Sequence, residues 1–109
     1  MAKTSIKAMP LLSYDTSSLV GAYIAINEPD GLTQACFTLK FSNISASTIT
    51  ISYDGITDHE VLRPNSDLLI TAQMNHQPRA DEVLFAKGTI IYVKGDDNVG
   101  TLYVSGYYV

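Results

Sequence analysis

Hydrophobic and polar residues alternate along much of the chain with a period of two, which is the pattern of a β-strand with one buried face. In CFTLKF, residues 36–41, every second residue from Phe37 is hydrophobic, and STITISY, residues 47–53, alternates in the same way. Similar runs, rich in β-branched and aromatic residues, predict further strands at residues 4–8, 20–26, 60–63, 67–71, 89–95 and 101–109. From the apolar sides of these strands we expect a core that includes Phe37, Leu39, Phe41, Ile49, Ile51, Leu102 and Val104.

Turn-forming residues separate these runs at short intervals. The candidate turns are residues 27–31, 42–45, 54–55, 64–66 and 95–98. No window of ten or more residues has the pattern of an amphipathic helix, and the best helical candidate, residues 80–87, is short. Seven or eight short strands joined in this way predict an all-β fold, either an antiparallel β-sandwich of the jelly-roll-like kind or a small barrel.

A chain of 109 residues has the size of one ordinary domain. We expect residues 19–109 to form a single β-sandwich domain, preceded by an N-terminal segment, residues 1–18, that can act as an extended arm. The longest irregular stretch, residues 72–88, is too long for a simple hairpin connection, and the sequence offers no catalytic pair of acids and no nucleophile that it would serve as a lid. We expect it to be a contact surface, with a surface loop that has no partner as the alternative.

Charge and hydropathy argue against nucleic-acid and membrane partners. The chain has 11 acidic and 7 basic residues, a net charge of −4, and basic residues scattered singly, whereas phosphate binding needs concentrated positive charge. No stretch approaches the length of a membrane helix, about 20 apolar residues, and the N-terminus lacks the apolar core of a signal peptide. We therefore expect a soluble protein made in the cytoplasm. Cys36 is the only cysteine, which excludes an intrachain disulfide and predicts a small buried hydrophobic residue.

The segment SYDGITDHEVL, residues 52–62, concentrates the ionisable residues Asp54, Asp58, His59 and Glu60. Asp54 and Gly55 lie between two strand patterns and form a hairpin signal, because both tolerate the positive φ of a tight turn. The spacing of the acids does not match a calcium loop, and the chain has only 2 histidines, too few for a histidine-rich zinc site. We interpret the segment as a turn, with a fortuitous cation site and acid–base catalysis as the alternatives.

Two other sets of residues have the chemistry of functional sites. KGDDNVG, residues 94–100, offers oxygen ligands for Ca²⁺, but glycines bracket it between two strands, so we interpret it as a turn. Ser105, His59 and Asp58 are the residue types of a nucleophilic triad, but nothing in the sequence indicates that the three side chains lie together. The sequence therefore predicts no catalytic, cofactor-binding or metal-binding residues, and no enzyme.

Aromatic and loop residues supply the candidate partner contacts. Tyrosines crowd the last predicted strand and offer rigid apolar area with a polar tip, which suits cross-strand packing, a protein interface or stacking on a sugar. In residues 72–88, a methionine and a phenylalanine can be buried by a partner, and an arginine offers a planar donor. The candidate contact residues are Met74, Arg79, Phe85, Tyr103, Tyr107 and Tyr108.

The order and character of three segments point to a known class of protein. CFTLKFSNISASTITISYDGITDHEVLRPNSDLLI, then AKGTIIYVKG, then GTLYVSGYYV resemble small virion structural proteins encoded by tailed bacteriophages, and the resemblance covers residues 35–109. It implies a non-enzymatic component without a cofactor, present in the particle as a homo-oligomer. Such a protein is made in the host cytoplasm and docks onto other virion proteins, as a capsid decoration, a head–tail connector or a tail protein.

A second function, from another class, is compatible with the same sequence. The clustered tyrosines suit a carbohydrate- or receptor-binding module used in host attachment, in which they form a stacking platform instead of a protein interface. The absence of tryptophan argues mildly against a sugar-binding module.

Overall fold

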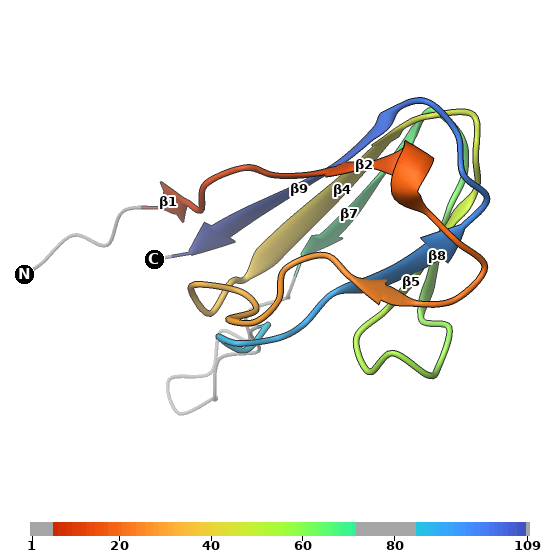
Figure 1. The fold of residues 1–109 in the computed structure, drawn as a ribbon. Coiled ribbons are helices and arrows are strands. Elements are labelled where there is room, and N and C mark those ends of the chain that lie inside the picture. The colour runs from red at the N-terminus through yellow and green to blue at the C-terminus, as the bar shows by residue number, and fades with distance from the viewer. Residues whose placement is uncertain (1–5, 72–84, 109) are drawn as a thin grey trace, which may run out of the picture.

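The chain folds into two antiparallel β-sheets packed face to face (Figure 1), in a computed structural model that describes residues 6–71 and 85–108. The predicted β-sandwich is confirmed. The described residues contain no α-helix, only one short 3₁₀ turn, and no helix among them is long and apolar enough to cross a bilayer.

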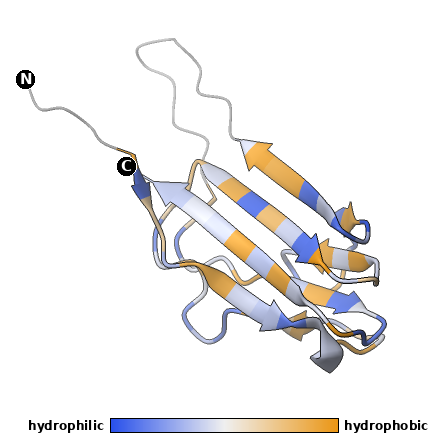
Figure 2. Cartoon of the chain, turned by 90° about the horizontal axis from the view of Figure 1, so that it is seen from above, coloured by the Kyte–Doolittle hydropathy of each residue, from blue (hydrophilic) through white to orange (hydrophobic). Residues whose placement is uncertain are grey.

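The first sheet has five strands. β4 (Thr38–Ile44) lies in the middle, between β9 (Thr101–Tyr108) and β7 (Ser66–Thr71). β1 (Lys7–Ala8) and β2 (Leu12–Asp15) both pair with the other edge of β9, at its two ends. Hydrophobic and polar positions alternate along β4 in Figure 2, as expected for a strand with one face on a core, whereas β7 has three hydrophobic residues in a row.

The second sheet has four strands in the order β3 (Ile24–Ala25), β8 (Tyr92–Gly95), β5 (Ile49–Ser52) and β6 (Glu60–Leu62). The β5–β6 hairpin pairs Ile49 with Leu62 and Ile51 with Glu60. The chain then passes to β7 of the first sheet through a turn in which Asn65 has a φ of 53°. The two sheets therefore share one hydrophobic interior.

The core contains every residue predicted for it except Phe37. Leu39, Phe41, Ile49, Ile51, Leu102 and Val104 are fully buried. Phe37 is only half-buried, because the chain bends there, between the bridge of Cys36 to Phe85 and the start of β4 at Thr38. The bend breaks the alternation and turns Cys36 inward, so that the predicted burial of this cysteine is confirmed.

Several boundaries differ from the sequence-based expectation. The strand expected over residues 20–26 is only β3, and the turn expected at residues 42–45 begins after β4 ends at Ile44. Asn43 belongs to β4, where it is buried: its amide donates to the carbonyls of Ser47 (2.7 Å) and Arg63 (3.1 Å). The helical candidate lies mostly outside the described residues, and its Phe85 forms an isolated β-bridge instead.

The N-terminal part that the structure describes lies along β9. The strand β2 was missed from the sequence because it is short and ends in an aspartate. That aspartate, Asp15, accepts hydrogen bonds from the amide and hydroxyl of Ser17, which lower its pKa and cap the 3₁₀ turn Thr16–Ser18. Thr16 is buried, and its hydroxyl donates to the carbonyl of Asn98 at 2.7 Å. An arm formed by residues 1–18 stays a prediction.

Candidate functional site

The segment SYDGITDHEVL, residues 52–62, contains the loop of the β5–β6 hairpin, residues 53–59. It is a turn region, as predicted, although this loop is longer than a tight turn. The Asp54 carboxylate accepts hydrogen bonds from the amides of Thr57 (2.7 Å) and Ile56 (2.8 Å) and from the hydroxyl of Ser52 (2.8 Å). These bonds hold the pKa of Asp54 well below its usual value. Gly55 has a φ of 78°, so Asp54 and Gly55 build the loop.

Asp58 connects this loop to two other segments of the four-stranded sheet. Its carboxylate accepts a hydrogen bond from the hydroxyl of Tyr23, just before β3, and lies 3.1 Å from Nζ of Lys94 on β8. Lys94 Nζ also lies 4.5 Å from the centre of the Tyr23 ring, a cation–π contact. The Tyr23 hydroxyl and Lys94 lower the pKa of Asp58, while desolvation and then Asp58 raise the pKa of Tyr23 to about 12. The charge of Asp58 is thus used to hold three segments together.

His59 is engaged within the same hairpin. Its Nδ1 accepts a hydrogen bond from the amide of Tyr53 at 3.0 Å, and the two rings lie 5.4 Å apart. Burial, and then the charge of Glu60, raises the pKa of Tyr53 to about 12. Ser105, the serine of the hypothetical triad, lies on β9 of the other sheet. The structure therefore does not bring Ser105, His59 and Asp58 together.

No metal centre is formed by the described residues: none of their His, Cys, Asp and Glu side chains gather in a group of three or more suited to an ion. In the segment of residues 94–100, Asp96 and Asp97 are exposed, and the carbonyl of Asp96 accepts a hydrogen bond from the hydroxyl of Ser47 at 2.7 Å. This connection packs against the rest of the fold through its backbone, as a turn would.

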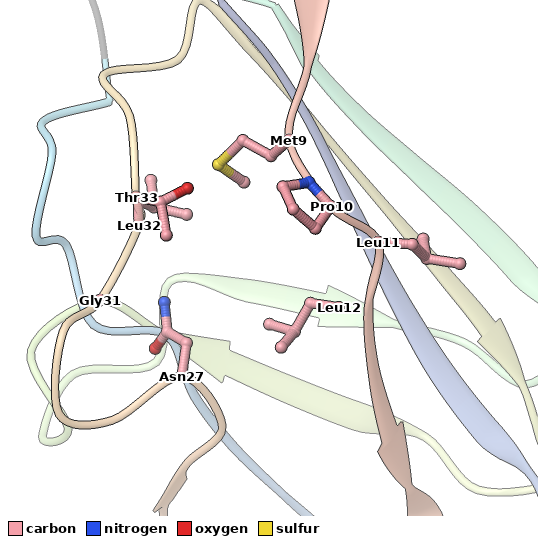
Figure 3. Close-up of a pocket in the computed structure, with 8 residues that line it drawn as sticks. All are labelled: Met9, Pro10, Leu11, Leu12, Asn27, Gly31, Leu32 and Thr33. Atoms are coloured by element: carbon pink, nitrogen blue, oxygen red, sulfur yellow. The ribbon is translucent and has the colours of Figure 1, made fainter.

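A small apolar hollow lies between the connection from β1 to β2 and the loop before Cys36 (Figure 3). It has a volume of about 200 Å³. Its wall residues are Met9, Pro10, Leu11, Leu12, Asn27, Gly31, Leu32 and Thr33. Asn27 supplies a polar side chain, and that amide is already bonded to the backbone of Thr89 (3.1 Å) and Ile91 (2.8 Å). The hollow offers shape and apolar surface, with no ionisable group to perform chemistry.

The three C-terminal tyrosines do not share one face. Tyr103 and Tyr107 are half-buried on the outer side of the five-stranded sheet, beside Ser42 and Thr38 of β4. Tyr108 alternates to the opposite side and packs against the hydrophobic core. A platform of three tyrosines is therefore not present, whereas a pair is.

The other candidate contact residues fall on or beside the segment of residues 72–84, which lies outside the described part of the chain. Met74 and Arg79 belong to that segment. Phe85 is described: its backbone exchanges two hydrogen bonds with Cys36 (2.7 and 2.9 Å), and its ring lies 6.2 Å from that of Tyr53. Part of Phe85 is therefore already covered by the core of the same chain.

The outer faces of the sheets carry exposed apolar residues that the sequence pattern did not indicate. Leu69 on β7 is 61% exposed, and Val61 on β6 is 62% exposed. Leu69 lies opposite Lys40 of β4, whose side chain is also exposed. The short apolar run after the turn at residues 64–66 predicted a strand that contains Leu69, but it could not show that this strand would lie at the edge of its sheet.

Comparison with known proteins finds little in the sequence: no protein-family model and no curated protein matches it. Among solved structures, the fold is similar to part of one described as "SPP1 Dit (gp 19.1) Protein, a Paradigm of Hub Adsorption Apparatus in Gram-positive Infecting Phages". The match has a TM-score of 0.46 and 13% sequence identity, and it covers 95% of this chain and 49% of that chain. The chain thus spans about half the length of that protein. At this similarity, function has to be argued from the residues of the chain itself.

Proposed function

We propose that the chain is a non-enzymatic structural protein of a tailed-phage virion, which assembles with copies of itself and docks onto capsid, neck or tail proteins. One observation carries the proposal: the ionisable residues that could perform chemistry are used to hold the fold. Asp54 shapes its own loop, Asp58 is shared by Tyr23 and Lys94, and His59 is bonded to Tyr53. The resemblance of residues 35–109 to small virion proteins agrees with a chain whose outer faces, and not a pocket, meet its partners.

Mass spectrometry of purified particles tests this role directly. In the phage that encodes the chain, we expect the protein to be present in mature virions at a constant number of copies per particle. Host proteins of similar abundance in the lysate serve as the control for contamination, because they should be lost during gradient purification. Recovery of the chain only in the lysate, and not in the particles, would contradict the proposal.

Residues 72–88 are the contact surface that we propose for docking. A long connection of this kind in a small sandwich is often a binding surface, and its Arg79 offers a planar, multidentate donor to a carboxylate of the partner. The variant Arg79→Glu should be incorporated into particles less efficiently while the free protein melts at an unchanged temperature. Arg63→Glu, an exposed arginine in the turn between β6 and β7, is the matched control. Equal incorporation of both variants would remove this assignment.

A carbohydrate- or receptor-binding role is the second candidate, since Tyr103 and Tyr107 lie on one outer face. Binding to a glycan array that is lost in Tyr107→Ala and kept in Tyr92→Ala would favour it. Tyr92 is a suitable control because it is a half-buried tyrosine on the other sheet. If the unaltered protein binds no glycan on the array, the carbohydrate-binding role is contradicted and only the structural role remains.

A further inference from the structure

β7 forms one edge of the five-stranded sheet in the part of the chain that the structure describes. In the described part of the chain, β7 is the last strand of the five-stranded sheet, beside β4, and no strand pairs with its other edge (Figures 1 and 2). Edge strands expose unpaired amide and carbonyl groups, and proteins usually protect them with lysine, proline or a bulge. The sequence of β7, SDLLIT, contains neither lysine nor proline, and its one charged residue is Asp67, near the start of the strand.

The opposite edge of the same sheet is different. It is formed by β1 and β2, which are separated by Met9, Pro10 and Leu11. Pro10 has no amide hydrogen to donate, and the Met9 amide already donates to the carbonyl of Gly106 at 2.8 Å. Among residues 6–15, the described part of this edge, there is therefore no uninterrupted run of six residues to match β7, which argues against a head-to-tail contact between the two edges.

We infer that β7 pairs with β7 of a second copy of the chain, antiparallel and around a two-fold axis at Leu69. The pairing must keep the core face aligned in both copies, because a slip by one residue would turn each side chain to the wrong face. Only registers that place outward residues opposite outward residues satisfy this condition. In β7 the outward residues are Asp67, Leu69 and Thr71, and Leu68 and Ile70 pack on the core.

Charge selects one of these registers. A two-fold axis at Asp67 would place two carboxylates directly opposite each other, and an axis at Leu68 would place Asp67 opposite a leucine. An axis at Leu69 places Leu69 opposite its own copy, Leu68 opposite Ile70, and Asp67 opposite the hydroxyl of Thr71. Apolar cross-strand pairs stabilise a sheet and like charges destabilise it, so the register at Leu69 is the favoured one. A symmetric contact of this kind closes at two copies.

This inference deepens the proposed function, because it identifies a contact through which copies of the chain can assemble. Its biological purpose rests on the proposed function, whereas the pairing itself does not. It can be tested on the isolated protein. By analytical ultracentrifugation the unaltered chain should be a concentration-dependent dimer. The variant Leu69→Lys, which places two cations across the axis, should weaken the dimer by about tenfold or more. Val61→Lys should not, although Val61 is equally exposed on the other sheet.

Cysteine cross-linking tests the register. Directly opposed residues of an antiparallel pair have Cα atoms about 4.5–5.5 Å apart, within the range of a disulfide. Leu69→Cys should therefore form a disulfide-linked dimer under mild oxidation, whereas Val61→Cys should stay monomeric on a denaturing gel. The native Cys36 is fully buried and does not interfere. A mixture of Asp67→Cys and Thr71→Cys should give the mixed dimer in preference to either homodimer.

Several results would overturn the pairing. These are a monomeric unaltered chain at millimolar concentration, growth of the assembly beyond two copies, or equal cross-linking of Leu69→Cys and Val61→Cys. Failure of the pairing is distinguishable from failure of the structural role. A chain that is monomeric in solution but present in purified particles would overturn the pairing and leave the role, while a dimer absent from particles would do the reverse.

Discussion

At the scale of single residues, buried polar side chains define the end of the sandwich. Asn43 is fully buried at the point where β4 ends. Its amide nitrogen donates to backbone carbonyls of Ser47 and Arg63, and its carbonyl accepts a hydrogen bond from the Ser45 hydroxyl at 2.6 Å. One side chain thus ties the turn after β4 to the turn between β6 and β7.

Replacing this asparagine should therefore be costly. In Asn43→Ala the carbonyls of Ser47 and Arg63 and the Ser45 hydroxyl each lose one hydrogen-bond partner, and an unsatisfied buried polar group costs about 1–3 kcal/mol. Urea unfolding followed by circular dichroism should show this loss, and the exposed Asn98→Ala should stay within about 0.5 kcal/mol of the unaltered protein. An unchanged unfolding midpoint for Asn43→Ala would contradict this role.

The lowered pKa values of Asp54 and Asp58 predict that the folded protein loses stability in acid. Both carboxylates have a folded pKa below the ordinary value of about 4, Asp54 through the backbone amides of its loop and Asp58 through Tyr23 and Lys94. A group with a lowered folded pKa stabilises the fold above its unfolded pKa, and this contribution disappears as the pH falls from about 4 toward the folded pKa. Urea midpoints measured at pH 6 and at about pH 2.5 should therefore differ less in Asp58→Asn than in the unaltered protein. Asp97→Asn, at another exposed aspartate, is the control, and an unchanged difference in Asp58→Asn would refute the assignment.

At the scale of elements, the bend before β4 separates two phenylalanines that the alternation placed on one face. Phe41 is fully buried, whereas Phe37 is half-buried beside the bridge from Cys36 to Phe85. Phe41→Ala should cost about 3–5 kcal/mol, and Phe37→Ala clearly less, because a partly exposed ring leaves a smaller cavity. Chemical denaturation of both variants measures the difference. Equal costs would mean that the strand continues through Phe37 without the bend.

At the scale of the whole molecule, the question is whether the N-terminal segment belongs to the sandwich. Leu12 of β2 packs on the core, whereas the adjacent Leu11 is 60% exposed. If β2 stays on β9 in solution, Leu12→Ala should lower the free energy of unfolding by about 2 kcal/mol, while Leu11→Ala should have little effect. Equal and negligible effects of the two variants would show that residues 1–18 detach as the arm expected from the sequence.

The sequence by itself determined most of the strands and most of the core, because a period-two pattern with one apolar side is a local property of the chain. The alternation of β4, β5 and β9 predicted Leu39, Ile51 and Val104 inside, and Asp54 with Gly55 predicted the hairpin loop. These features depend on residues close together in the chain. They were found without knowing which strands are neighbours.

Only the tertiary structure decided what depends on distant residues. The bend at Phe37 follows from the bridge between Cys36 and Phe85, and the burial of Asn43 follows from carbonyls up to 20 residues away. The partnership of Asp58 with Tyr23 and Lys94 likewise joins three separate segments. The edge position of β7 depends on the order of strands in the sheet, which the pattern within a strand does not encode. For that reason the surface around Leu69 could be recognised only once the sheet was assembled.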